Sequence, residues 1–388
     1  MKRMLSVLLN GIVLLTTGIL LNGCGDKSAK INGVAKAADG SYIVTISEPQ
    51  HSLGYLPIYI AQNEGYLKDA KIKLSYLTGG GGAHVKSVIS GDSWAVIGSI
   101  DSNEAAAVGS GVEFTSIVNC AAKANVYITA ATVLPDYKGS LELSPDNTEL
   151  IEYFLQLYNG KPVTITAGRY GGTPNVLVRY MLVKLGFKEV SPTEYSYSGN
   201  GMSGTLYMVN TADASAIKAT VETGGAQMAN PADPMLAAGV LDGTWYEPFI
   251  KFHNLGDFAY SVLSTTWGAL KTEEGKAIAQ NIVSAIVKSL KKCELARQEY
   301  LAGAKGENYE WLLKCAKDEF GASYSEKDLV TCVDRALEDA WWSPDGSISK
   351  QALDIDMEVP PFTSACDSIT IDSVNGRKTF CRKTFCNT

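Results

Sequence analysis

Short β-rich segments alternate with short helical segments from Tyr42 onward, and this alternation constrains the fold more than any other feature of the sequence. Four segments open the series: strand Tyr42–Ser47, helix Leu56–Tyr66, strand Lys71–Leu77 and helix Ala83–Ser90. Strands that alternate with helices form β–α–β units around a mainly parallel sheet. We therefore expect an α/β protein.

The alternation occurs twice and is followed by helices. The first round continues through strand Trp94–Ser99, helix Ser102–Val108 and strands Phe114–Asn119 and Val126–Ala130; the second starts at strand Pro162–Thr166 and helix Asn175–Leu185. After Thr272 apolar residues recur every four positions, as in amphipathic helices. The pattern predicts one α/β unit over about residues 41–130, a second over about 131–257, and helices after them.

The composition supports a globular chain and excludes nucleic-acid binding. Of 388 residues 46% are hydrophobic, which is ample for a packed core. The formal net charge is −7, and no run of Lys and Arg provides the basic surface that nucleic acids require.

The N-terminus has the features of an export signal. Lys2 and Arg3 precede an apolar stretch, Leu5–Leu21, that is slightly short for a membrane-spanning helix. Leu21-Asn22-Gly23-Cys24 then resembles a bacterial lipobox, which predicts cleavage before Cys24 and its lipidation. We expect residues 1–23 to be a signal peptide and 24–40 the lipidated cysteine with a flexible tether. A plain signal peptide with an incidental cysteine is the alternative.

This organisation predicts a location outside the cytoplasmic membrane, on its outer face or in the periplasm, with a lipid anchor. Seven cysteines follow Cys24 with no C-x-x-C spacing, and the chain has only three histidines. We therefore expect no metal site and no cofactor.

Several short motifs, in order, resemble a known family over about residues 41–350. They are Tyr55–Ala61 with Glu64–Leu67, Gly91-Asp92 before Trp94–Gly98, Gly160-Lys161 with Ala167–Thr173, Gly239-Val-Leu-Asp242 with Glu247-Pro248, and Trp342–Gly346. The chain resembles the extracytoplasmic solute-binding proteins for aliphatic sulfonates, nitrate, taurine and thiamine-pyrimidine precursors. The resemblance implies a type II periplasmic-binding-protein fold, in which two α/β lobes joined by a hinge close over a ligand. Residues 41–130 together with 258–388 would form lobe 1, and residues 131–257 would form lobe 2.

The function that this resemblance implies is binding rather than catalysis. A lipid-anchored monomer would capture a small organic anion, such as a sulfonate, taurine or nitrate, and deliver it to an ABC permease and its ATPase. One alternative is a thiamine-pyrimidine precursor or another planar heterocycle. An enzyme on the same fold is a further alternative, but such enzymes are cytosolic, and no catalytic triad or metalloprotease motif occurs in this chain.

Candidate ligand contacts in lobe 1 follow the ends of predicted strands, where ligands bind in open α/β sheets. They are His51, Gly54 and Tyr55 after the first strand, Gly80 and Gly81 after the second, Ser99, Asp101 and Ser102 after the third, and Thr129 near the hinge. A surface histidine, a flexible glycine run and an ordinary helix N-cap are the competing interpretations.

Candidate contacts in lobe 2 centre on a glycine loop before a helix. Arg169 next to Gly171, Gly172 and Thr173 combines a guanidinium with a helix N-terminus, a pairing suited to an anion. Trp245 and Glu247 are candidates for an aromatic wall and a cleft residue, and a core tryptophan is the competing interpretation. Asp257 and Glu48 could instead pair with a cationic ligand.

Overall fold

The computed structural model describes residues 31–349 except 81, 101–102, 104–106, 108–109, 124–125, 171 and 212–213, together with the strands β16 (Ile369–Asp372) and β17 (Arg377–Phe380). The described residues belong to one compact unit, Ile31–Thr388. The predicted signal peptide, Cys24 and the first part of the tether lie outside the described residues.

The second part of the predicted tether is a strand instead. Strand β1 (Val34–Lys36) pairs antiparallel with the start of β2, with Val34 opposite Val44. Gly33 lies so close to the backbone of Trp94 that an added Cβ would be 1.9 Å from the Trp94 nitrogen. Ile31 is also buried, so packing against the sheet orders a stretch that looks small and polar in sequence.

The first sheet has a parallel centre with antiparallel additions. Its order is β1-β2-β4-β15-β5, with β3 on the other side of β2. β2 is parallel to β3 and β4, whereas β15 runs antiparallel to β4 and β5. The bounds are β2 (Tyr42–Glu48), β3 (Ile72–Thr78), β4 (Ala95–Gly98), β5 (Phe114–Ala121) and β15 (Ser261–Thr266).

The second sheet also combines parallel and antiparallel strand pairs. Its order is β10-β11-β12-β9-β13-β6-β14, with β9 parallel to β12 and β13. The bounds are β6 (Tyr127–Ala130), β9 (Thr164–Thr166), β10 (Lys188–Ser191), β11 (Glu194–Gly199), β12 (Met202–Val209), β13 (Met228–Ala229) and β14 (Ile250–Lys251). The meander β10–β12 has no counterpart in the sequence prediction. A small hairpin, β7 (Leu157–Tyr158) with β8 (Lys161–Pro162), precedes β9.

The lobe boundary predicted after residue 130 is wrong by one strand. β6 was expected in lobe 1, but it pairs with β13 and β14 in the second sheet. The chain therefore crosses between the sheets before Tyr127, and it returns near Asp257. The two crossing segments lie side by side, because Phe258 N–H donates to the Ala122 carbonyl (2.8 Å) and Lys123 pairs with Asp257 (2.7 Å).

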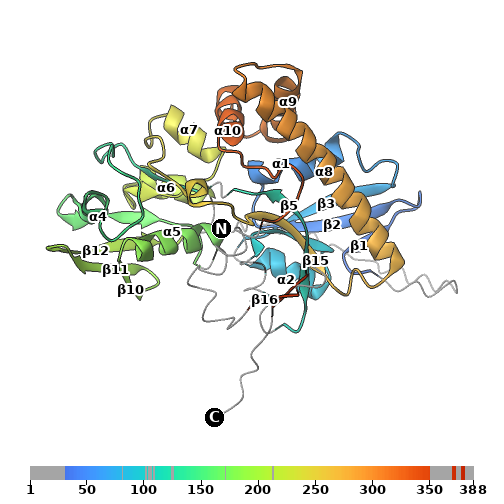
Figure 1. The fold of residues 1–388 in the computed structure, drawn as a ribbon, viewed down its shortest axis with the longest axis horizontal. Helices are drawn as coiled ribbons and strands as arrows, with labels where there is room; N and C mark the ends of the chain where they lie inside the picture. Colours follow the sequence, from blue (N-terminus) through green and yellow to red (C-terminus); the bar gives the residue numbers. More distant parts are fainter. Residues whose placement is uncertain are drawn as a thin grey trace, which may run out of the picture. The chain divides into compact units, whose positions relative to one another are not determined.

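Helices cover both sheets, as Figure 1 shows. The 29-residue helix α8 starts at its N-cap Thr272 and contacts α1, α9 and β5, which builds the main core around residues such as Ile282 and Leu290. A capping box at Ser325 and Asp328 starts α10. The bounds are η1 (Leu53–Tyr55), α1 (Leu56–Asn63), α2 (Ala83–Ser90), α4 (Thr148–Leu155), α5 (Thr173–Lys184), α6 (Ala214–Glu222), α7 (Met235–Leu241), η2 (Phe252–Leu255), α8 (Glu273–Leu301), α9 (Glu307–Phe320) and α10 (Glu326–Glu338).

Within the part of the chain that the structure describes, every helix is too short or too polar to cross a membrane.

Candidate ligand-binding site

The candidate site starts from the carboxyl ends of the parallel strands in the two sheets. In the first sheet β2 and β3 end together, with Glu48 opposite Thr78, and Ser99 follows the end of β4. In the second sheet β9 ends at Thr166, and the Asn230 N–H that follows β13 donates to the Thr166 carbonyl (3.2 Å). These strand ends are where open α/β sheets place ligands.

One contact joins the strand ends of the two sheets. The Ser99 hydroxyl is hydrogen-bonded to the Thr173 hydroxyl, although the two residues are 74 positions apart. Ser99 is buried, whereas Thr173, the first residue of α5, is half-buried. The structure thus brings together two residues that the sequence predicted as ligand contacts from different lobes.

The loop between β9 and α5 presents the charge and the dipole that were predicted for an anion. Gly168 has a φ of +67°, which lets the chain turn sharply after β9. Arg169 is exposed, and its carbonyl accepts a hydrogen bond from Gly172 N–H (3.0 Å). Gly172 is the N-cap of α5 and has no side chain to shield the N-terminus of the helix, where the helix dipole favours negative charge.

His51 lies at the first sheet's edge, but carboxylates already occupy both ring nitrogens. Nδ1 is 3.4 Å from Glu48 and Nε2 is 3.1 Å from Glu319 of α9. The ring also stacks on Tyr59, with the centroids 4.5 Å apart. Burial lowers the pKa of His51, but the hydrogen bonds to Glu319 and Glu48 outweigh it and raise the pKa to about 9. His51 is thus a cation that is paired with two of the protein's own carboxylates. Its contact with a ligand stays a prediction, and these bonds do not favour it.

The Glu48 carboxylate is satisfied by the protein in the same way. It accepts hydrogen bonds from the hydroxyls of Tyr59 (2.5 Å) and Thr78 (2.9 Å), in addition to its contact with His51. Asp257, the other acid considered for a cationic ligand, pairs with Lys123. Neither acid offers a free carboxylate to a cation in this arrangement.

The remaining lobe 1 candidates lie beside these residues. Gly54 and Tyr55 belong to the buried turn η1, and burial raises the pKa of the Tyr55 hydroxyl well above its ordinary value. Gly80 precedes α2, and its carbonyl accepts a hydrogen bond from Ala83 N–H (3.3 Å). Thr129 is buried in β6 and donates its hydroxyl hydrogen bond to the Tyr246 carbonyl. Gly81, Asp101, Ser102 and Gly171 lie outside the described residues.

Trp245 matches the competing interpretation of a core residue. It is 1% exposed, and its indole N–H donates to the Leu236 carbonyl of α7 (3.0 Å). Gly239 makes room for it, since an added Cβ would lie 2.2 Å from the indole ring. Glu247 is exposed and approaches Arg335 of α10 at 3.3 Å. An aromatic wall at Trp245 is therefore not favoured by its surroundings.

Sequence reasoning missed several buried polar residues at the same strand ends. Thr166 and Thr211 share a hydrogen bond between their hydroxyls (3.1 Å). The side chains of Asn103, after β4, and Asn230, after β13, are also buried. Asn230 directly follows the short strand Met228–Ala229, which the sequence did not predict.

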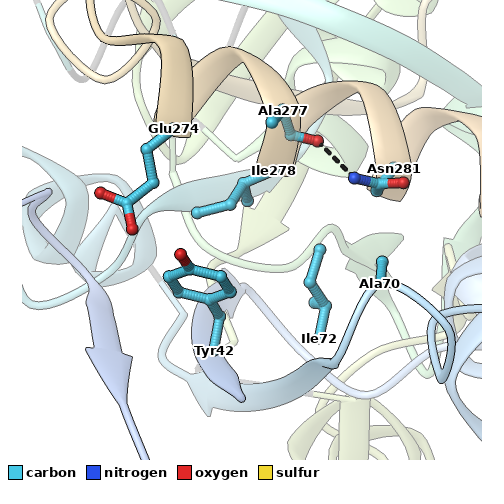
Figure 2. Close-up of a pocket in the computed structure, with 7 residues that line it drawn as sticks. All are labelled: Tyr42, Ala70, Ile72, Glu274, Ala277, Ile278 and Asn281. Carbon is cyan, nitrogen blue, oxygen red and sulfur yellow. Dashed lines mark hydrogen bonds between the residues drawn. The ribbon is translucent and has the colours of Figure 1, made fainter. Parts of the chain in front are cut away.

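A cavity of about 380 Å³ lies elsewhere, under the start of α8 (Figure 2). Tyr42 and Ile72, which begin β2 and β3, form its floor, so it is at the opposite end of these strands from the candidate site. The other lining residues are Ala70, Glu274, Ala277, Ile278 and Asn281. In the described part of the chain, no three His, Cys, Asp or Glu side chains gather in a way that could hold a metal ion.

Comparisons with known proteins agree on the fold. No family model and no curated protein sequence matches the chain. Among solved structures, the alkanesulfonate-binding protein SsuA from Xanthomonas axonopodis pv. citri bound to MOPS is similar, at 14% identity and a TM-score of 0.56, covering 83% of this chain and 92% of that one. The periplasmic nitrate-binding protein NrtA from Synechocystis PCC 6803 is 12% identical, with a TM-score of 0.55, covering 76% and 69%.

The periplasmic aliphatic sulphonate-binding protein SsuA from Escherichia coli gives a similar result, at 12% identity and a TM-score of 0.54, covering 83% of this chain and 86% of that one. At 12–14% sequence identity, these similarities show that the fold is shared. The chain has the type II periplasmic-binding-protein fold, an α/β architecture built on two main sheets.

Proposed function

We propose that this chain is the solute-binding component of an ABC importer and that it captures a small organic anion, such as a sulfonate, taurine or nitrate, between its two lobes. The observation that carries the proposal is the pairing of Ser99 with Thr173, because it places the strand ends of both sheets around one point. A solute bound there contacts both lobes, and its binding is coupled to their closure.

The anion class is supported by the loop that leads to α5. Arg169 is exposed on this loop, and the N-terminus of the 12-residue helix follows it. A guanidinium and a helix N-terminus both favour an anion. The two acids that could have favoured a cation instead, Glu48 and Asp257, are bound by the protein's own donors.

The delivery role follows from the proposed export and anchoring. Cleavage before Cys24 and its lipidation would tether a monomer to the outer face of the cytoplasmic membrane or in the periplasm. There it would pass its solute to a permease that is powered by an ATPase. On this proposal the chain is not an enzyme.

A planar heterocycle, such as a thiamine-pyrimidine precursor, is the second candidate. Tyr170 follows Arg169, is 49% exposed and has the Arg179 guanidinium 4.9 Å from its ring centroid. An exposed aromatic ring on the same loop would suit a ligand that stacks.

A thermal-shift screen tests the proposal directly. Any solute that binds only the folded chain raises its melting temperature, by an amount that grows with the ratio of its concentration to Kd. We expect stabilisation by one class among sulfonates, nitrate and aminopyrimidines. If no compound in these classes stabilises the chain, the proposed function is wrong.

A further inference from the structure

Two buried asparagine side chains, one after β4 and one after β13, have no hydrogen-bond partner in the described part of the chain. Asn103 is 0% exposed and Asn230 is 3% exposed. In both, the amide oxygen and the amide nitrogen lack a partner among the residues that the structure describes. Native proteins rarely leave buried polar groups unsatisfied, so two complete orphaned amides need an explanation.

Asn103 is attached to the end of β4. Its backbone N–H donates to the Ser99 carbonyl (3.1 Å), so it lies one helical turn after the residue that contacts Thr173. Its side-chain oxygen is 2.8 Å from the position of a Cβ added to Gly98, the last residue of β4. The amide therefore packs directly over the end of this strand, and only a glycine leaves room for it.

Asn230 lies at a strand end of the second sheet. It follows β13 directly, and its N–H donates to the carbonyl of Thr166, the last residue of β9. The loop that leaves β9 carries Arg169 and leads to Thr173. Asn103 is thus bonded to Ser99 itself, and Asn230 is bonded to the strand whose loop leads to Thr173.

The chemistry of an amide limits what can satisfy it. Its nitrogen donates hydrogen bonds and its oxygen accepts them, whereas the oxygens of a sulfonate or a nitrate only accept. A pure acceptor would leave both asparagine oxygens unpaired in the closed site, at a substantial loss of binding free energy.

We propose that Asn103 and Asn230 determine specificity by binding an uncharged group that both donates and accepts, such as a hydroxyl or a carboxamide, carried by the anion beside its charge. This inference rests on the proposed function. In this arrangement the loop before α5 binds the charged group of the ligand, and the two amides select its uncharged group.

Two sulfonates of equal heavy-atom number test the proposal by titration calorimetry. 2-Hydroxyethanesulfonate has a hydroxyl where 1-propanesulfonate has a methyl group. We expect the hydroxylated compound to bind the full chain at least about tenfold more tightly, because a site built for a hydroxyl rejects the analogue that lacks it. The ratio of the two affinities is the readout.

Variants test whether the two asparagine amides cause this ratio of affinities. Asn230→Leu and Asn103→Leu keep the side-chain shape and should reduce the ratio to about one, while 1-propanesulfonate binding is retained. Gly98→Ala should have the same effect, because its Cβ displaces the Asn103 amide. Asn281→Leu, an exposed asparagine on α8, is the matched control and should leave the ratio unchanged.

Folding is controlled separately. If a leucine variant does not fold, Asn230→Asp keeps the shape and the acceptor oxygens, and it should weaken both sulfonates while preserving the preference for the hydroxyl. Equal binding of the two sulfonates by the wild-type chain would overturn this inference and leave the proposed function intact, with ordered water as the partner of the amides. Binding of neither compound, nor of any other anion in the screen, would overturn the proposed function as well.

Discussion

A histidine between two carboxylates illustrates how single residues hold this fold together. His51 joins the end of β2, through Glu48, to the last turn of α9, through Glu319. Phe320 packs beside the ring, with the centroids 4.8 Å apart. The cation therefore links the first sheet to the C-terminal helices, and we expect its main contribution to be to stability.

The pH dependence of stability tests this role. The pKa of His51 is raised from 6.5 to about 9 in the folded chain, so the stabilisation is complete below pH 6.5 and is lost as the pH rises to about 9. Because the side chain is 40% exposed, we expect only about 1 kcal/mol. Chemical denaturation of wild type and His51→Gln should differ by this amount at pH 6 and converge at pH 10. A constant difference across this range would contradict the assignment.

Arg169 is the residue on which the anion class depends. Arg169→Ala should weaken the anion found in the screen by at least about tenfold, since a hydrogen bond to a charged group contributes about 1.5–3 kcal/mol. The melting temperature without ligand should not change, because the side chain is exposed. Lys138→Ala, which removes another exposed cation of the second lobe, is the control. Unchanged affinity in Arg169→Ala would remove this residue from the site.

At the scale of elements, a buried ion pair joins α10 to the loop before α7. Arg335 Nη1 is 2.6 Å from Asp233, and their side chains are 7% and 0% exposed. Asp233 also accepts the Ala237 N–H of α7 (2.9 Å). This pair ties the α7 segment to the helices that pack on the first sheet.

A double-mutant cycle measures how strongly this pair holds the two elements. Arg335→Met leaves the Asp233 carboxylate buried and unpaired, which should cost about 3–5 kcal/mol of unfolding free energy. Adding Asp233→Asn should recover part of that loss. Lys314→Met, which breaks the exposed pair with Asp318, should change stability by less than about 1 kcal/mol. An equally small effect of Arg335→Met would show that the pair does not hold α7 in place.

The elements also show what the sequence could and could not predict. Local patterns located helix Ala83–Ser90 at its observed bounds and identified Ser99 and Thr173 as residues at strand and helix ends. The sheet to which β6 belongs depends on its pairing with β13 and β14, about 100 or more positions later, and no local pattern contains that information.

Burial at the candidate site was equally hard to predict. Trp245 is in the core because Gly239 leaves space for its ring, and Glu319, a partner of His51, lies far along the chain. The mixed strand directions in both sheets have the same origin, since antiparallel partners such as β15 come from distant segments. Tertiary contacts, rather than residue type, decide these features.

At the scale of the whole molecule, the net charge poses a problem for an anion-binding protein. The proposed cleavage before Cys24 would remove Lys2 and Arg3 and change the formal charge from −7 to −9. The overall field then repels an anion, so local donors must provide the attraction. Arg169 and the start of α5 are the donors that the proposed site offers.

Lipid anchoring is tested on the intact chain in a bacterial host. Cys24→Ala removes the residue that would be lipidated, and we expect the protein to move from the membrane fraction to the soluble exported fraction or to remain uncleaved. Cys120→Ala, a buried cysteine, is the control and should leave the distribution unchanged. A Cys24→Ala protein that is cleaved and still found in the membrane fraction would contradict lipidation at this residue.

The most direct test of the central claim, that one solute is held by both lobes, is titration calorimetry with the best anion from the screen. We expect one site per chain. Ser99→Ala and Thr173→Ala, from opposite lobes, should each weaken binding by at least about tenfold, because the site then loses a hydrogen-bonding group. Two controls should bind like wild type: Ser110→Ala, whose hydroxyl donates to the Ala107 carbonyl, and Thr223→Ala, which directly follows α6. Unchanged affinity in both Ser99→Ala and Thr173→Ala would show that the solute is not held by both lobes at this point.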